Sequence, residues 1–191
     1  MIVVAGLGNP GRRYEHTRHN VGFMVADRLV ESAGGGAFRA KFQGDLAMVE
    51  LLGHDVLVLK PQTFMNESGR SVRQALDYHR LGPDALIVVH DELDLPFGQL
   101  RLKLGGGEAG HRGLRSISSH LGDPGYARLR VGIGRPQAGF SGDVVDYVLE
   151  AFAAAERPLL DEVIDRAVDA IRRIAETSLP AAMNQVNRKP S

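Results

Sequence analysis

Two short apolar runs constrain the fold of this chain more than any other feature of its sequence. Residues 2–7 and residues 85–89 are almost wholly apolar and rich in Val and Ile. Such runs are typical of strands buried on both faces in the centre of a parallel sheet. In open sheets of this kind, functional sites lie beyond the carboxyl ends of the strands. We therefore expect the two polar loops that follow these runs, residues 8–20 and 90–96, to form the site.

The rest of the chain alternates further strands with helices. Strands are expected at residues 46–52 and 56–59, which form a hairpin, and at 100–104 and 127–133. Helical periodicity covers residues 20–33, 67–81, 111–121 and 157–177. This order predicts an α/β fold in which helices flank a twisted, mixed and mostly parallel sheet. Residues 1–191 are expected to form a single domain, with a weakly specified tail after about residue 179.

Composition excludes several classes of protein. The 191 residues include no cysteine, so disulfides, thiolate catalysis and Cys-ligated zinc are excluded. The amino terminus lacks the basic lead of a signal peptide, and no apolar run approaches the ~20 residues of a membrane span. We expect a cytosolic (cytoplasmic) protein with no membrane partner.

Charge is distributed unevenly along a chain whose formal net charge is zero. The stretch from residue 98 to 135 holds two acids, Glu108 and Asp123, and seven basic residues: Arg101, Lys103, Arg112, Arg115, Arg128, Arg130 and Arg135. These side chains could form a local phosphate-binding face, or a solvated surface of mixed charge.

The loop after the first apolar run formally matches the dinucleotide-binding pattern G-x-G-x-x-G. Pro10 and Gly11 predict a turn there, and helical periodicity starts only near Asn20, whereas the dinucleotide fold begins its helix at once. We reject an oxidoreductase on these grounds. We expect the glycines to allow a tight turn that brings Asn9 close to a ligand.

His19 and Asp91 form the predicted chemical centre. His19 lies at the predicted start of a helix, whose dipole favours a neutral imidazole, while a nearby carboxylate has the opposite effect. Asp91 ends the second apolar run and can accept a hydrogen bond from one ring nitrogen, so that the other faces water. No G-x-S-x-G elbow is present, so we expect water to be the nucleophile.

Other polar residues have a structural interpretation as well as a functional one. His19, His90, Asp91, Glu92, Asp94 and His111 could supply metal ligands, but no H-E-x-x-H or similar spacing occurs, so no metal site is predicted. Asn66 could cap the helix that follows it, or hold a carbonyl oxygen and a water. The glycine-rich residues 103–113 could bind an anion and close over a substrate, or form an ordinary flexible loop.

Taken together, several motifs closely resemble the bacterial peptidyl-tRNA hydrolase family. Their order and spacing match from Met1 to about Asn187. The matching segments are residues 6–11 with Tyr14, Thr17-Arg18-His19-Asn20, Phe64-Met65-Asn66, residues 90–94 and residues 103–107.

This resemblance implies a monomeric α/β hydrolase that cleaves the ester between a peptide and the terminal ribose of tRNA, without metal or cofactor. It implies that His19 activates water, that Asp91 orients His19, that Asn66 holds substrate and water, and that Asn9 recognises the N-acylated peptide. The residues expected to line the cleft are Tyr14, Phe64 and Met65, and those expected to bind tRNA phosphates are Lys103 and Arg130.

One position departs from the family pattern. The family usually has G-G-H-N-G where this chain has Ala109-Gly110-His111-Arg112-Gly113. Arg112 cannot accept a hydrogen bond, so it cannot orient water as the family's Asn does. We expect Arg112 to contact substrate or to point into solvent. Two other functions remain open, namely an RNA-binding module without turnover and a hydrolase for another N-acylated ester or amide.

Overall fold

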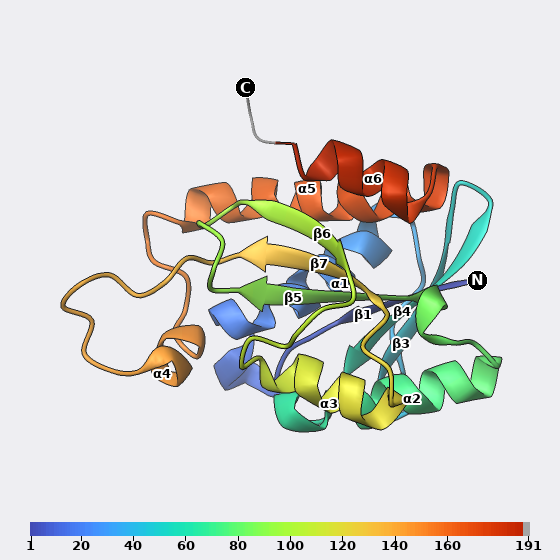
Figure 1. Cartoon of the computed structure of the whole chain (residues 1–191), viewed down its shortest axis with the longest axis horizontal. Helices are drawn as coiled ribbons and strands as arrows, with labels where there is room; N and C mark the ends of the chain where they lie inside the picture. Colours follow the sequence, from blue (N-terminus) through green and yellow to red (C-terminus); the bar gives the residue numbers. More distant parts are fainter. Residues whose placement is uncertain (189–191) are drawn as a thin grey trace.

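A computed structural model describes residues 1–188 and shows an α/β fold built on one seven-stranded sheet (Figure 1). The strands lie in the order β2-β3-β4-β1-β5-β7-β6. Their bounds are β1 (Ile2–Gly6), β2 (Arg39–Lys41), β3 (Gly44–Leu51), β4 (His54–Pro61), β5 (Leu86–Glu92), β6 (Leu100–Leu104) and β7 (Ala127–Gly132). The central strands β4, β1, β5 and β7 are parallel, while β2, β3 and β6 add antiparallel pairings at the two sides. The predicted mixed α/β sheet is confirmed.

Helices cover both faces of the sheet (Figure 1). They are α1 (Val21–Ser32), α2 (Ser68–His79), α3 (Arg112–Leu121), α4 (Val144–Val148), α5 (Arg157–Glu176) and α6 (Leu179–Val186). One face packs α1 and α5 against β-strand residues such as Val4 and Val89, and the other packs α2 and α3 against Val3 and Val88. Because both faces are covered, the central strands are apolar throughout, which is the pattern seen in the sequence. Within residues 1–188, no helix combines the length and the apolar character needed to cross a membrane.

The tail after residue 179 is more ordered than expected. Residues 179–186 form α6, and the Ser178 side chain accepts a hydrogen bond from the backbone N–H of Ala181 at its start. The Asn187 amide then bonds both the N–H and the C=O of Leu102 on edge strand β6, each at 2.8 Å. The prediction of a weakly specified tail is therefore wrong for this helix. Residues 189–191 lie outside the described residues.

Two glycines bring the candidate site together. A Cβ atom on Gly6 would lie 2.2 Å from the carbonyl oxygen of Gly22, and one on Gly22 would lie 2.5 Å from the carbonyl oxygen of Val89. Because neither glycine has a Cβ atom, α1 can pack directly against the ends of β1 and β5. The first glycine of the G-x-G-x-x-G match therefore serves helix packing. As predicted, the long helix starts late, after short 3₁₀ turns at Arg12–Tyr14 and Arg18–Asn20.

Candidate active site

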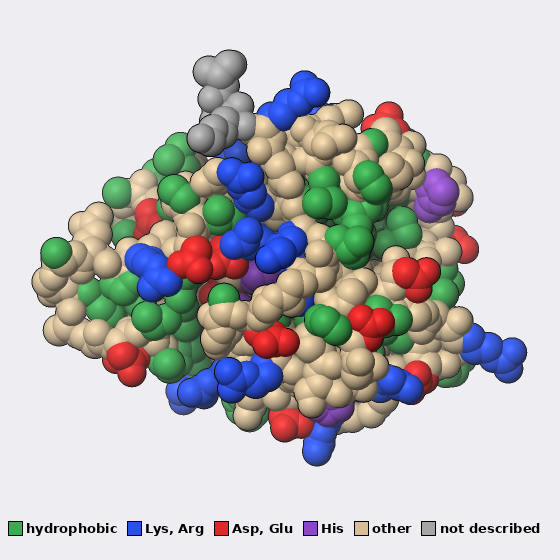
Figure 2. Space-filling view, viewed as in Figure 1, with side chains coloured by type: hydrophobic (Ala, Val, Ile, Leu, Met, Phe, Trp, Pro, Cys, Tyr) green, Lys and Arg blue, Asp and Glu red, His purple; other side chains and the backbone are tan. Residues whose placement is uncertain are grey.

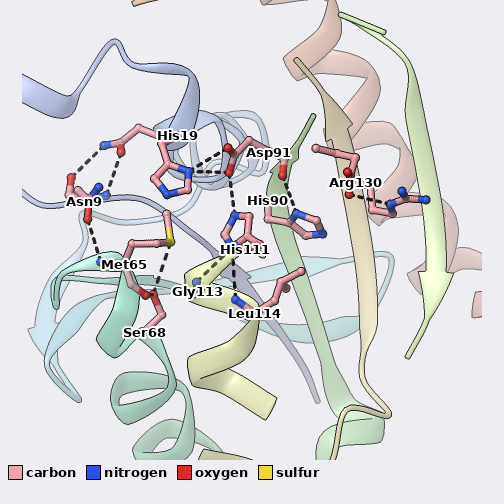
Figure 3. Close-up of polar contacts among 12 residues, drawn as sticks. Asn9, His19, Met65, Ser68, His90, Asp91, His111, Gly113, Leu114 and Arg130 are labelled. Carbon is pink, nitrogen blue, oxygen red and sulfur yellow. Dashed lines mark hydrogen bonds and ion pairs between the residues drawn. The ribbon is translucent and has the colours of Figure 1, made fainter. Parts of the chain in front are cut away.

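The structure brings His19 and Asp91 into contact (Figure 3). His19 lies in the 3₁₀ turn before α1, and Asp91 lies near the end of β5, which is the parallel neighbour of β1. His19 Nδ1 is 3.0 Å from Asp91 Oδ1 and 2.9 Å from Oδ2. The predicted proximity of the two side chains is confirmed. His19 Nδ1–H donates to the carboxylate, so the imidazole retains a lone pair on Nε2.

A second imidazole binds the same carboxylate. His111 Nε2 lies 2.9 Å from Asp91 Oδ1 (Figure 3). His111 Nδ1 accepts hydrogen bonds from the backbone N–H groups of Gly113 and Leu114, at 3.2 and 3.3 Å, and so caps α3. Because Nδ1 is an acceptor, the ring proton is on Nε2 and is donated to Asp91. The sequence marks His111 as a possible metal ligand, and no pattern in it indicates this role.

Charge interactions within this cluster outweigh burial. Burial would raise the pKa of Asp91, but the neighbouring His19 and His111 lower it well below its usual range. Burial would likewise lower the pKa of His19, yet the Asp91 carboxylate and its hydrogen bond outweigh this, so the net pKa of His19 is raised above 6.5. The positive charge of the nearby Arg112 lowers the pKa of His19. The pair therefore combines an ionised carboxylate with an imidazole whose pKa is raised by that carboxylate.

His90 has a structural role beside this cluster. Its side chain is buried, its Nδ1–H donates to the backbone carbonyl of Asp91 at 2.8 Å, and its ring packs edge-on against His111. Burial and the neighbouring His111 lower the pKa of His90 to about 3, so the ring is neutral. His90 therefore supports the backbone that carries Asp91.

Three residues of the cluster could in principle hold a metal ion. The candidate ligand atoms of His19, Asp91 and His111 all lie within 4.8 Å of one another. The sequence spacing could not indicate this group, because its members come from three separate segments. Hydrogen bonds between the carboxylate and the two rings already give each of these atoms a partner. A cation would have to displace two N–H donors from Asp91.

Asn9 is held in place by two neighbours. Its backbone N–H donates to Asn20 Oδ1 at 2.8 Å, and Asn20 Nδ2 donates to the Asn9 carbonyl at 2.9 Å. Its side-chain Oδ1 accepts from the backbone N–H of Met65 at 2.8 Å (Figure 3). With Oδ1 occupied, Asn9 offers its Nδ2–H₂ group as a donor to a ligand. Asn20 is thus a positioning residue that the sequence analysis did not identify.

Arg18 anchors the turn that carries His19. Its guanidinium is buried, lies over the ring of Tyr147 at 4.1 Å, and donates to Glu156 Oε1 at 3.1 Å and to the Tyr147 carbonyl at 3.2 Å. Its backbone N–H also donates to the carbonyl of Glu150. These contacts join the His19 turn to the segment around α4. Arg18 belongs to the Thr17-Arg18-His19-Asn20 motif, but nothing in the sequence indicates that its side chain is buried.

A cleft of about 350 Å³ opens beside His19. Seven predicted site residues line it, namely Asn9, His19, Phe64, Met65, Asn66, Asp91 and Arg112. Met65 is buried, whereas Phe64 is 60% exposed at the opening. Val144 and Val145 of α4 and Ala109 of the glycine-rich loop also line the cleft. The cleft therefore joins a polar centre to an apolar wall.

Other predicted site residues lie elsewhere. Tyr14 is half-buried beneath the guanidinium of Arg13, and neither Tyr14, Lys103 nor Arg130 is among the described residues that line the cleft. Asn66 does not cap α2, because the residue at the cap position is Glu67 and no side-chain cap bond forms there within residues 1–188. The capping interpretation of Asn66 is therefore wrong, and its amide remains available to a ligand.

The predicted basic face is smaller than its sequence suggests. Arg128 is buried and donates to the carbonyl oxygens of Gly106 and Gly107, so it holds the glycine-rich loop and does not face solvent. Arg130 Nε lies 3.1 Å from Glu92 Oε2, and Arg135 is paired with Asp94. Only part of the predicted positive charge is therefore free to meet a polyanion.

Comparisons with known proteins agree on one family. Residues 3–191 match the family described as peptidyl-tRNA hydrolase. A relative named peptidyl-tRNA hydrolase from Sorangium cellulosum is 52% identical over all of this chain and 85% of its own length. Another of that name, from Anaeromyxobacter dehalogenans strain 2CP-C, is 50% identical over 99% of this chain and 97% of its own.

Solved structures agree with this assignment. A crystal structure of peptidyl-tRNA hydrolase from Acinetobacter baumannii superposes with a TM-score of 0.90 and 40% sequence identity, covering 98% of this chain and 94% of that one. A complex of peptidyl-tRNA hydrolase with N-propanol gives a TM-score of 0.91 at 40% identity, over 100% of this chain and 97% of that one. On its sequence, its fold and the extent of these matches, the chain belongs to the peptidyl-tRNA hydrolase family.

Proposed function

We propose that this chain hydrolyses the ester between an N-blocked aminoacyl or peptidyl group and the 3′-terminal ribose of tRNA. The observation that carries the proposal is the hydrogen-bonded pair of His19 and Asp91, at 2.9 Å, on the wall of a cleft in a chain of this family. His19 Nε2 is the ring nitrogen that is not bonded to Asp91. It is therefore the atom available to accept a proton.

In the proposed mechanism, His19 Nε2 takes a proton from a water molecule as the water oxygen attacks the ester carbonyl carbon. The bond between that carbon and the ribose oxygen then breaks, and the imidazolium returns the proton to the leaving ribose oxygen. Asp91 stabilises the transient imidazolium and fixes the ring's orientation. The products are free tRNA and a peptide with a free carboxylate. No metal or cofactor is required for these steps.

Substrate contacts in this proposal come from other residues that line the cleft and from two basic residues outside it. The Asn66 amide can hold both the ester carbonyl oxygen and the water, and the Asn9 Nδ2–H₂ group can donate to the acyl carbonyl of a blocked amino group. A free aminoacyl group lacks that second carbonyl, so it would bind less well. Phe64 and Met65 would contact the peptide or the terminal base, while Lys103 and Arg130 would contact phosphates. A monomeric, cytoplasmic protein acting in translation remains our prediction.

The test is single-turnover release of an N-acetylated amino acid from tRNA, with the free aminoacyl-tRNA as control substrate. His19→Ala should lower the rate by about 10²- to 10⁴-fold, as expected for loss of a general base. His16→Ala is the matched control, because His16 is an exposed imidazole three residues earlier. Binding of tRNA without any cleavage by the wild type would contradict the proposal and favour an RNA-binding module.

A further inference from the structure

A second cavity, a groove next to the loop before β6, is lined by three arginines. Its volume is about 660 Å³, and it lies between α5, α6 and the start of β6. The charged residues that line it are Arg166, Arg173 and Arg188, with one acid, Asp169. Arg166 and Arg173 are seven residues apart on α5, so they lie on one face of the helix, roughly 10 Å apart. None of the three falls within the basic stretch predicted from the sequence.

Two of these arginines have no acidic partner among residues 1–188. Arg173 donates to the uncharged Gln185 Oε1 at 2.7 Å. Among residues 1–188, no carboxylate lies within 4.0 Å of the guanidinium of Arg173 or of Arg188. Asp169, the acid in the groove, is 3.5 Å from Arg172, which donates to the Ser32 hydroxyl at the end of α1. The groove therefore retains a local positive charge in a chain whose formal net charge is zero.

One loop connects the groove to the candidate active site. Glu92, Leu93 and Asp94 line the cleft, and the same loop goes on to line the groove with Phe97, Gly98 and Gln99. Directly after this loop, Arg101 on β6 lies opposite Arg130 on β7. Figure 2 shows basic side chains on this face of the molecule, over β6 and β7. A polyanion whose end lies in the cleft can therefore extend over β6 to the groove.

We infer that this groove binds backbone phosphates of the tRNA body, away from the 3′-terminal ribose that enters the cleft. Arginine favours phosphate because its planar guanidinium donates two parallel hydrogen bonds. The inference rests on the proposed function, since that function provides a nucleic acid held by its end next to the groove. It also explains how a chain with little net charge could hold tRNA, because binding of phosphates requires only a local basic surface.

The test compares the double variant Arg173→Gln, Arg188→Gln with Arg73→Gln. Arg73 is the control, because it is an exposed arginine on α2 whose guanidinium contacts Asp77, and neither residue lines the groove. Each protein is assayed on N-acetyl-aminoacyl-tRNA and on the same N-acetyl-aminoacyl ester of the terminal CCA trinucleotide. Filter binding of deacylated tRNA, at several salt concentrations, gives a readout that does not depend on catalysis.

For the double variant we expect KM and Kd for full-length tRNA to rise roughly 3- to 10-fold at low salt, with the slope of log Kd against log salt shallower by about 2. The trinucleotide ester should be cleaved as by the wild type. The single variant Arg188→Gln leaves the contact between Arg173 and Gln185 intact and should show half of the slope change. Such a partial change, in a variant that keeps this contact, would exclude a folding defect as the cause.

Equal values for the double variant and Arg73→Gln would overturn the inference, as would an equal loss on the trinucleotide ester. If the wild type binds tRNA but cleaves neither substrate, the proposed hydrolysis fails. Filter binding then still decides whether the groove contacts tRNA.

Discussion

Two sets of residues that line the cleft differ in how completely their polar groups are hydrogen-bonded. In the bonded set, Asp91 is buried and bonded to His19 and His111, and His111 is bonded in turn to the start of α3. In the exposed set, Asn66 and Arg112 are exposed and make no side-chain hydrogen bond within residues 1–188. The groups proposed to carry the chemistry are thus held in place before substrate arrives, whereas Asn66 and Arg112 are free to form contacts on binding.

This difference predicts different kinetic effects. Variants of the bonded set should lower kcat, because they disturb groups proposed to act in the transition state. Variants of the exposed set should act mainly on KM or on the response to salt.

The largest effect in this comparison is expected from Asp91→Asn. The uncharged amide no longer stabilises an imidazolium and no longer fixes the tautomer of His19, so kcat should fall by about 10²- to 10⁴-fold. Asp94→Asn is the control, since Asp94 is an acid of the same loop that is paired with Arg135. Steady-state kinetics on N-acetyl-aminoacyl-tRNA check the prediction. A fall no larger than that of the control would show that the bonded set does not carry the chemistry.

A smaller effect is expected from His111→Asn. Asparagine is a good helix cap but is too short to repeat the bond to Asp91, so α3 should remain capped while kcat falls about 10- to 100-fold. His111→Ala loses the cap as well, and its free energy of unfolding should be lower by about 1 kcal/mol than that of His111→Asn. Kinetics and urea unfolding of both variants separate the two roles. Full activity of His111→Asn would limit His111 to capping.

The smallest effect is expected from Arg112→Asn, which restores the residue that the family usually has. Substantial activity should remain, and the slope of log KM against log salt should become shallower by about 1 if Arg112 contacts a phosphate. Removal of this cation should also raise the pKa of His19, so the rising limb of the pH profile should move to higher pH. Arg115→Asn, on an exposed part of the same helix, is the control. Total loss of activity in a folded protein would show that Arg112 has become catalytic.

The sequence predicted those parts of the site that follow directly from strand order. The segments 2–7 and 85–89 are apolar enough to be recognised as central strands, and neighbouring parallel strands bring the loops at their ends together. This placed His19 beside Asp91. The tail helix α6 also carried readable signals, since Ser178 and Pro180 are typical of a helix start, but the sequence analysis did not use them.

Other features depend on contacts between distant segments, which spacing cannot show. His111 reaches Asp91 only because its loop folds back on β5, and the bonds of its Nδ1 to α3 are what determine its tautomer. Arg128 alternates with apolar residues like its neighbour Arg130, yet it is buried by carbonyl groups of a loop that lies more than twenty residues earlier. The sequence therefore suggested that the charge of Arg128 was available to a ligand, whereas in the fold its guanidinium is bonded to backbone carbonyls.

We propose that Asp91 raises the pKa of His19 and orients its ring, so that His19 can act as a base. A measurement of the His19 pKa tests this most directly. We would titrate the imidazole of His19 by NMR in the wild type and in Asp91→Asn, with the signal assigned by its loss in His19→Ala. The account predicts a pKa above 6.5 in the wild type, because the ionised carboxylate favours the imidazolium, and a pKa below 6.5 in Asp91→Asn, where burial acts unopposed. In the wild type, kcat/KM should rise with pH through the same pKa, because the neutral ring is the active form. A His19 pKa that is the same in both proteins would contradict the account.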